Sequence, residues 1–282
     1  MSGKTWLITG CSTGIGRALA DLVLKSGERV VATARNPGSL DELIAPHAGR
    51  ALALKLDVTQ PDDIANAVAA TRERFGAVDV LVNNAGYGHI GTIEETPIDA
   101  ARAVLETNLF GALAMIKAVL PEMRQRRAGQ IVNIASVAGL VGFPILGYYC
   151  ASKFALIALT ESLAAEVRGF GIKVTVAELG PFATDFTKSM TSSVPVTSEY
   201  DLRALTQAAG TSHWGVGESP RDAVAAILSA INHPSPPLHL IVGQLGLEVV
   251  ERYETKRREE RERWIDTTRL EPRVVSGASS GQ

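Results

Sequence analysis

The feature that most constrains the fold of this chain is a glycine-rich turn near its N-terminus. The residues from Thr9 to Gly16 separate a short aliphatic segment from an amphipathic one. Between a strand and a helix, such glycines permit a tight turn, a close approach of the backbone to a diphosphate, and close helix packing. The free N–H groups of the helix N-terminus attract phosphate, although turns also collect glycine for purely steric reasons. The position of the turn predicts a nucleotide site formed by Gly10, Ser12, Thr13, Gly14, Ile15 and Gly16.

Short aliphatic segments alternate with amphipathic segments over most of the chain. We predict strands at 5–9, 29–34, 51–56, 78–83, 130–136, 173–178 and 238–242. We predict helices at 14–26, 61–75, 99–126, 149–169 and 219–232. Aliphatic runs without alternation indicate strands buried on both faces, and their alternation with helices indicates right-handed βαβ units. The predicted fold class is α/β, a doubly wound, Rossmann-like parallel sheet of seven strands with helices on both faces.

The length of 282 residues would suggest two domains, but an α/β sheet of this kind often forms one domain of about 250 residues. We therefore expect one nucleotide-binding and catalytic domain over 1–250. A segment rich in Ser, Thr and Gly at 185–217 is expected to form a substrate lid. Residues 251–270 have mixed charges at helical spacing and indicate a solvated surface helix, or else an oligomer contact through Tyr253 and Trp264. The last residues, 271–282, are expected to be disordered.

Composition excludes several functional classes. There are 28 Lys and Arg against 30 Asp and Glu, a net charge of −2, so no broad basic field is available for nucleic acid. No charge occurs between Arg127 and Lys153, but polar residues, glycines and a proline interrupt that stretch, and we expect no membrane span. Two cysteines, Cys11 and Cys150, are read as small buried thiols and indicate a reducing, cytoplasmic location. The histidines show no paired ligand spacing, and we expect no metal site.

The end of the second predicted strand indicates which cofactor is bound. A carboxylate there would bind the ribose 2′-hydroxyl of NAD, but this chain has Arg35 and no carboxylate. An arginine can pair with a 2′-phosphate through two parallel hydrogen bonds, so we predict NADP(H) in preference to NAD(H). The alternative is an exposed arginine that merely ends a strand.

Polar and small residues also follow the third and fourth predicted strands. Asp57, next to Val58, could accept a hydrogen bond from the adenine amino group, and Asn84, Ala85 and Gly86 follow the fourth strand. Either group could be simple turn chemistry. Both are placed at the carboxyl ends of parallel strands, where such folds bind ligands. We therefore predict that all five contribute to the cofactor site, and that Asn84 also ties neighbouring strands together.

A phenol and an ammonium lie four residues apart at the start of a predicted helix, and so on one face of it. They are Tyr149 and Lys153, and Ser152 occupies the equivalent place for the competing phenol Tyr148. A cation about 5 Å from the phenol would lower its pKa by about two units, towards 7–8. General acid–base catalysis is efficient in that range. Taken alone, such a pair more often consists of two exposed surface residues with no catalytic role.

Two further polar residues favour a catalytic interpretation. Ser136 ends the fifth predicted strand and could donate a hydrogen bond to a substrate carbonyl oxygen. Asn108 interrupts an otherwise apolar helix, where asparagine is poorly favoured unless its polar groups are used. A water held there could relay protons to Lys153. Taken singly, Ser136 could be a strand-end turn residue and Asn108 a helix irregularity.

In combination and order, these residues resemble those of the single-domain short-chain dehydrogenases/reductases, over residues 4 to about 245. The matching positions are 9–16, 57, 83–86, 108, 136, 149 and 153. The resemblance implies that Tyr149 is the catalytic acid/base and that Ser136 polarises the carbonyl. It implies that Lys153 lowers the pKa of the phenol. It also implies that Lys153 and Tyr149 contact the cofactor, with Lys153 holding the nicotinamide ribose, and that Asn108 anchors a relay water. It also implies a homodimer or homotetramer formed through the helices at 99–126 and 149–169.

The match has one departure, after the sixth predicted strand. The family usually has Pro-Gly there, followed by a threonine that contacts the nicotinamide carboxamide. Gly180 and Thr184 match and are predicted cofactor contacts, but Leu179 stands in place of the proline. We expect this leucine to loosen the turn or to alter the placement of the nicotinamide without abolishing binding.

The predicted function is an NADP(H)-dependent oxidoreductase that interconverts a secondary alcohol and a ketone or aldehyde. The substrate is expected to be an apolar small molecule, from the residues expected at the entrance: Val141, Phe143, Pro144, Ile145, Leu146 and Phe182. Apolar lining is common to most pockets, so it identifies the substrate only broadly. The alternative is a catalytically silent NAD(P)-binding regulator or sensor.

Overall fold

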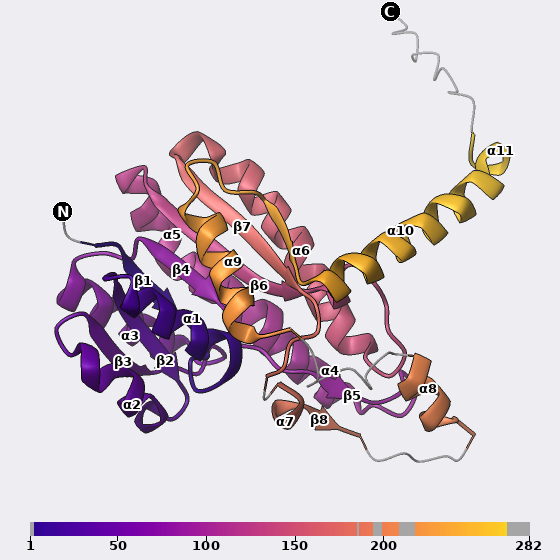
Figure 1. Ribbon diagram of the computed structural model, residues 1–282, viewed down its shortest axis with the longest axis horizontal. Helices are drawn as coiled ribbons and strands as arrows, with labels where there is room; N and C mark the ends of the chain where they lie inside the picture. The colour runs from indigo at the N-terminus through magenta and orange to yellow at the C-terminus, as the bar shows by residue number, and fades with distance from the viewer. Residues whose placement is uncertain (1–2, 185, 194–198, 209–217, 270–282) are drawn as a thin grey trace, which may run out of the picture.

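A sheet of parallel strands forms the centre of the computed structural model (Figure 1), which describes residues 3–184, 186–193, 199–208 and 218–269. The strands are β1 (Thr5–Ile8), β2 (Arg29–Ala34), β3 (Ala51–Lys55), β4 (Val80–Asn83), β6 (Gly129–Ser136), β7 (Ile172–Leu179) and β9 (His239–Val242). Their order across the sheet is β3-β2-β1-β4-β6-β7-β9, and every pairing is parallel. The predicted doubly wound, seven-stranded sheet is confirmed. The strand order reverses between β1 and β4, which places a ligand-binding crevice at the carboxyl ends of these strands.

Helices cover both faces of the sheet. They are α1 (Gly14–Lys25), α3 (Pro61–Phe75), α4 (Ile98–Leu105), α5 (Ala112–Arg126), α6 (Gly147–Val167) and α9 (Pro220–Asn232). On one face, Leu19 of α1 and Ile227 of α9 share a buried cluster with the sheet. On the other face, Val68 of α3, Val119 of α5 and Leu163 of α6 share a second cluster. The inner strands β1, β2, β4, β6 and β7 are therefore buried from both sides, as the absence of polar alternation predicted, whereas the edge strands β3 and β9 are mostly half-buried.

A short π-helical segment, η3 (Glu106–Gly111), joins α4 to α5 and makes one helix of Ile98–Arg126. By length and apolarity this helix could cross a membrane, with a mean hydropathy of 1.6 over its most apolar window. In this fold its inner face is part of the core, because Met115, Val119 and Met123 are buried among the strands and neighbouring helices.

The predicted lid contains short regular elements in its described residues. These are α7 (Phe186–Ser189), β8 (Thr191–Ser192) and α8 (Leu202–Ala208), while residues 185, 194–198 and 209–217 lie outside the described chain. Strand β8 pairs in parallel with β5 (His89–Ile90), which follows β4. The other short elements are α2 (Asp41–Ile44), η1 (Pro37–Leu40), η2 (Ala45–His47), η4 (Val137–Gly139) and η5 (Arg168–Phe170).

The charged C-terminal segment is helical, and it begins earlier than its composition indicated. Helix α10 spans Gln244–Arg263 and α11 spans Ile265–Thr268, whereas the predicted range was 251–270. The predicted disordered tail, 271–282, lies outside the described residues. Figure 1 shows α10 extending away from the sheet. Its first half contacts the body of the molecule, and its last turns are exposed.

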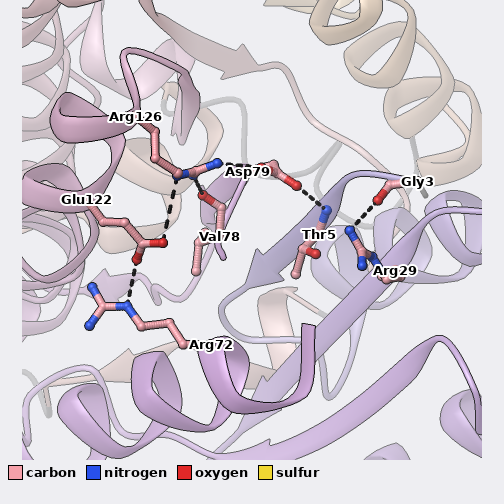
Figure 2. A network of polar contacts seen from close by, with 8 residues as sticks. All are labelled: Gly3, Thr5, Arg29, Arg72, Val78, Asp79, Glu122 and Arg126. Atoms are coloured by element: carbon pink, nitrogen blue, oxygen red, sulfur yellow. Dashed lines mark hydrogen bonds and ion pairs between the residues drawn. The ribbon is translucent and has the colours of Figure 1, made fainter. Parts of the chain in front are cut away.

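A polar network closes the opposite end of the sheet, at the amino ends of the strands (Figure 2). The carboxylate of Asp79 accepts a hydrogen bond from the backbone N–H of Thr5 over 2.9 Å and pairs with Arg126 over 3.0 Å. Glu122 pairs with Arg72 over 2.6 Å and lies 3.7 Å from Arg126. The network joins β1, α3, α5 and the residue before β4, so polar groups there are used to hold the fold together.

Candidate active site

The glycine-rich turn has a backbone that only glycine adopts without strain. Gly10 and Gly14 have φ angles of +71° and +59°. A Cβ on Gly10 would lie 2.9 Å from the Cα of Ala85, and a Cβ on Gly16 would overlap the side-chain amide of Asn84. The turn is therefore pressed against the loop after β4. That packing leaves the surface of the turn open for a phosphate group to approach the backbone.

Asn84 holds these two loops together. Its side-chain amide donates to the carbonyl oxygens of Thr9, over 2.9 Å, and Gly10, over 3.0 Å. The hydroxyl of Thr9 in turn accepts from the backbone N–H groups of Asn84 and Ala85. The predicted tying role of Asn84 is seen directly in these contacts.

A cavity of about 1460 Å³ runs along the carboxyl ends of the strands. It is lined by most of the predicted cofactor residues, namely Gly10, Ser12, Thr13, Gly14, Ile15, Arg35, Asp57, Val58, Asn84, Ala85, Gly86, Gly180 and Thr184. The predicted catalytic residues Ser136, Tyr149 and Lys153 line it as well, whereas Gly16 and Asn108 lie behind its wall. The glycine turn in its wall and the volume of the cavity fit an extended dinucleotide.

The residues predicted to bind the 2′-phosphate and the adenine, Arg35 and Asp57, differ in how they are engaged. The guanidinium of Arg35 is exposed on the cavity and forms no ion pair with a residue that the structure describes. One carboxylate oxygen of Asp57 accepts from both the N–H, over 3.0 Å, and the hydroxyl, over 2.8 Å, of Thr59. Arg35 is thus available to bind an anion, whereas one carboxylate oxygen of Asp57 is already hydrogen-bonded within its own turn.

Tyr149, Ser136 and Lys153 come together in the middle of the cavity. Tyr149 lies in the first turn of α6, and its ring packs 5.6 Å from that of Phe186 in α7. The ammonium of Lys153 lies 5.8 Å from the centre of the Tyr149 ring and donates to the carbonyl oxygen of Ile134 over 2.9 Å. Ser136 ends β6, and its hydroxyl donates to the carbonyl oxygen of Leu179 over 3.2 Å. The arrangement places two hydroxyl groups and a cation at one point.

The expectation that Lys153 brings the pKa of Tyr149 towards 7–8 is wrong, because the pKa lies above the ordinary value of a phenol. Burial raises the pKa of the phenol above its ordinary value, and a hydrogen bond with Ser136 opposes the rise only in part. Burial also lowers the pKa of Lys153 to about 8. Coulomb attraction over a short distance was the basis of the expectation. Removing both groups from water is the larger effect, because it penalises the charged form of each.

Asn108 lies in the π-helical segment, and its side chain is fully occupied. The amide oxygen accepts from the N–H of Tyr87 over 3.0 Å, and the amide nitrogen donates to the carbonyl oxygen of Tyr87 over 2.9 Å. The same nitrogen donates to the hydroxyl of Ser152 over 3.0 Å. A π-helical turn shifts the backbone hydrogen-bonding pattern and often occurs at functional sites. The side chain of Asn108 therefore positions the loop after Gly86 and the helix that carries Tyr149.

The turn after β7 accommodates Leu179 in place of the usual proline. Leu179 is buried, and its carbonyl oxygen receives the Ser136 hydroxyl. Gly180 donates its N–H to Val242 in β9 over 2.9 Å, so the turn is held to the neighbouring strand. A Cβ on Gly14 would lie 3.9 Å from the Cβ of Thr184, so these two predicted contacts lie close to each other.

Sequence reasoning missed several residues around the site. Ser152 was noted only as the residue that leaves Tyr148 without a partner, and His89 and the inner face of α10 were not singled out. His89 bonds to Thr191 over 2.7 Å and to Ser193 over 2.8 Å. The position of Ser152, between Tyr149 and Lys153, was a usable signal for its role.

The described residues contain no group of three or more His, Cys, Asp or Glu placed to hold a metal ion.

Comparison with known proteins gives the same class of enzyme as the geometry, a nicotinamide-dependent oxidoreductase. A family model described as short chain dehydrogenase matches residues 4–195. Oxidoreductase BOA17 of Botryotinia fuckeliana is 36% identical over 248 residues, 87% of this chain and 90% of that protein. Retinol dehydrogenase 8 of Homo sapiens is 39% identical over 252 residues, 83% of this chain and 80% of that protein. The chain belongs to the short-chain dehydrogenase/reductase family, whose members are oxidoreductases that act on CH–OH groups with NAD or NADP.

Solved structures agree with this assignment. A short-chain dehydrogenase from Streptomyces avermitilis superposes with a TM-score of 0.87 at 36% identity, covering 95% of this chain and 98% of that one. A short chain dehydrogenase from Burkholderia cenocepacia in complex with NADP has a TM-score of 0.73 at 25% identity, covering 93% and 97%. One from Burkholderia phymatum in complex with NAD has a TM-score of 0.77 at 26% identity, covering 98% and 99%. A nicotinamide cofactor is therefore supported, and similar structures hold either form.

Proposed function

We propose that this protein is an NADP(H)-dependent oxidoreductase that interconverts a secondary alcohol and a ketone or aldehyde on an apolar small molecule. The observation that carries the proposal is the convergence of Tyr149, Ser136 and Lys153 within one cavity that the glycine-rich turn also lines. Asn108 does not line the cavity, and it holds the loop after Gly86 and the helix that carries Tyr149 in position. The walls near Tyr149 are apolar and include Val141, Phe143, Phe186 and Met190, which favours an apolar substrate.

In the direction of reduction, the phenol of Tyr149 gives a proton to the carbonyl oxygen of the substrate. Because burial raises its pKa, the phenol is protonated at neutral pH and is ready to donate. The hydroxyl of Ser136 can turn from Leu179 to the same substrate oxygen and stabilise the charge that develops there. The bound nicotinamide supplies the hydride. In oxidation Tyr149 accepts the proton, and its anion is stabilised by the nearby ammonium of Lys153.

The proposed roles require that Tyr149 be essential and that the neighbouring phenol be dispensable. We expect Tyr149→Phe to bind NADPH normally but to lose at least about 100-fold in kcat, because the general acid is absent. Tyr148→Phe is the matched control, since that phenol does not line the cavity and donates to the carbonyl oxygen of Ile93. Turnover is followed at 340 nm with a panel of ketones and aldehydes. Activity of Tyr149→Phe equal to wild type would refute the mechanism, and cofactor binding without any turnover would favour a catalytically silent sensor.

The proposed preference for NADP(H) rests on Arg35. We expect Arg35→Ser to weaken NADPH binding by about 10-fold and to leave NADH binding almost unchanged, because only NADPH has a 2′-phosphate. Arg221→Ser is the control, because Arg221 is an exposed arginine at the start of α9 that does not line the cavity. Equal losses for both cofactors in Arg35→Ser would overturn the preference.

We also propose that the protein is a cytoplasmic homodimer or homotetramer. Two aromatic residues on the outward faces of η3 and α6 support the assembly, since Phe110 is 48% exposed and Phe154 is 38% exposed. Exposed aromatic side chains often mark contact surfaces between proteins. The two cysteines are buried as free thiols, which supports a reducing compartment. Light scattering of wild type against Phe110→Glu and Phe154→Glu tests the assembly, which a monomeric wild type would contradict.

A further inference from the structure

One face of α10 forms the outer wall of the cavity. The residues of α10 that line it are Leu245, Glu248, Val249, Arg252, Tyr253 and Lys256. They recur every three or four residues, which places them on one side of the helix. Across from them, α8 contributes Gln207 and Ala208 to the lining. In Figure 1 both helices lie beyond the same end of the sheet. The outer end of the cavity therefore opens between α10 and α8.

The polarity of this face changes along the helix. Its inner end has the apolar side chains of Leu245 and Val249, and its outer end has two cations, Arg252 and Lys256, one helical turn apart. Both cations are exposed, and neither forms an ion pair within the described part of the chain. The acidic residue on this face is Glu248, which lies one turn further in and accepts a hydrogen bond from Gln244 over 3.0 Å.

The base of α10 is fixed, so this face keeps its orientation toward the cavity. A Cβ on Gly180 would lie 3.0 Å from the backbone nitrogen of Gly246, so the turn after β7 and the helix touch through two glycines. The carboxylate of Glu218 accepts the N–H of Gln244 over 2.9 Å at the helix start. Val250 is buried on the inner side of the helix. These contacts hold the first two turns, and the cations follow directly after them.

We propose that Arg252 and Lys256 form a subsite for an anionic group at the distal end of the substrate. The inference rests on the proposed function and specifies its substrate class. The carbonyl or alcohol carbon lies at Tyr149, an apolar chain passes between Phe143, Met190 and Val249, and a carboxylate or phosphate group reaches the two cations. Two adjacent cations that form no ion pair with the described residues suit either anion, because no ion pair seen in the structure has to be broken.

The subsite is tested by equilibrium binding to the protein loaded with NADP⁺, so that the result does not depend on turnover. The probes are decanoate, decyl phosphate and the neutral methyl decanoate, measured by calorimetry. The test variant is Arg252→Gln with Lys256→Gln. The matched control is Arg258→Gln with Arg261→Gln, which removes the same charge from exposed positions of α10 that do not line the cavity.

We expect the test variant to bind at least one anionic probe about fivefold more weakly than wild type, with methyl decanoate unchanged. The control variant should match wild type, and the affinity of wild type for the anion should fall as salt is added. Selective loss of decanoate or of decyl phosphate distinguishes a carboxylate from a phosphate ligand. Equal loss in the control variant, or anions that bind wild type no better than the methyl ester, would overturn the subsite. The panel assay with Tyr149→Phe decides the proposed function separately.

Discussion

The side-chain amide of Asn108 donates a hydrogen bond to the hydroxyl of Ser152 over 3.0 Å, in the interior between η3 and α6. The hydroxyl of Ser152 in turn donates a hydrogen bond to the carbonyl oxygen of Tyr149 over 2.7 Å. Both side chains are buried, with Asn108 1% exposed and Ser152 0% exposed. The π-helical segment is thereby connected to the turn of helix that carries Tyr149, the proposed proton donor. Under the proposed function Ser152 is a positioning residue, because it does not line the cavity and contacts Tyr149 and Asn108 instead.

Removal of the Ser152 hydroxyl should therefore affect stability and the placement of Tyr149. We expect Ser152→Ala to lower the free energy of unfolding by about 1 kcal/mol and to reduce kcat more than it raises KM. Ser162→Ala is the control, because Ser162 is an exposed serine of the same helix whose hydroxyl also donates to a preceding carbonyl oxygen. Urea unfolding and steady-state kinetics measure the two effects. A kcat of wild-type size in Ser152→Ala would assign Ser152 a purely structural role.

The close contact between Gly16 and Asn84 gives a second prediction. We expect Gly16→Ala to weaken NADPH binding and to destabilise the protein by about 1–3 kcal/mol, because the added Cβ overlaps the Asn84 amide and the Gly10 carbonyl oxygen. Gly49→Ala is the control, since a Cβ at Gly49 meets nothing within 4 Å. Fluorescence titration with NADPH and thermal unfolding report the result. Normal cofactor affinity in Gly16→Ala would show that the loop can move aside.

His89 fastens the described part of the predicted lid to the loop after β4. One ring nitrogen bonds to Thr191 over 2.7 Å and the other to Ser193 over 2.8 Å, and the ring is 4% exposed. Strand pairing adds to this contact, since Thr191 donates its N–H to Gly88 over 3.0 Å. The same segment brings Met190 over the cavity.

Loss of the imidazole should therefore loosen the lid. We expect His89→Ala to speed hydrogen exchange at 186–193 by about 10-fold and to raise KM, with the rest of the sheet unaffected. His233→Ala is the control, because the imidazole of that exposed histidine bonds to Ser235, two residues away. Burial lowers the pKa of His89 below 6.5, so the unfolded state binds a proton first as the pH falls. Lid protection in wild type should thus weaken below pH 6.5, and unchanged exchange in His89→Ala would disprove the fastening role.

The lowered pKa of Lys153 predicts how the stability of the cofactor-free protein depends on pH. The pKa is about 8 when folded and 10.5 as a free side chain, so between these values the unfolded state binds more protons. Stability from this group therefore rises with pH over that window, by at most about 1.4 kcal/mol per pH unit. We expect urea unfolding between pH 8 and 9.5 to show this slope in wild type and in Lys117→Met, an exposed control. The slope should be absent in Lys153→Met, and its persistence there would assign it to another group.

Periodic segments of the fold could be predicted from the sequence, and short ones could not. The helix at Pro61–Phe75 and the strand at Arg29–Ala34 have the predicted bounds, because the buried residues of the helix recur at helical spacing and the strand is a continuous buried run. The two-residue strands His89–Ile90 and Thr191–Ser192 are too short to show a period. Helix α10 was predicted to start at 251, where the charges begin. It starts at Gln244, because its first turns carry the apolar residues that face the cavity and the sheet.

The site shows a similar division. The spacing of Tyr149 and Lys153, and the position of Ser136 at a strand end, predicted that they would share one region, because the carboxyl ends of parallel strands lie together. The direction of the pKa shift of Tyr149 could not be obtained from spacing, since it depends on how completely the phenol and the ammonium are removed from water. The hydrogen-bond partners of Asn108 also depend on tertiary packing. Its contact with Tyr87 could not be predicted from any local sequence pattern.

The meeting of Gly180 and Gly246 has a consequence for how this enzyme can diversify. The residues proposed for the chemical step belong to β6 and α6, whereas the outer wall of the cavity belongs to a helix attached at its base through two glycines. Substitutions along α10 can change the molecules that are accepted without disturbing the proton donor or the nucleotide cradle. A side chain larger than hydrogen at either glycine would tilt the whole wall at once. Substitutions on the cavity-facing side of α10 can therefore change the substrate range gradually, whereas substitutions at Gly180 or Gly246 would change it abruptly.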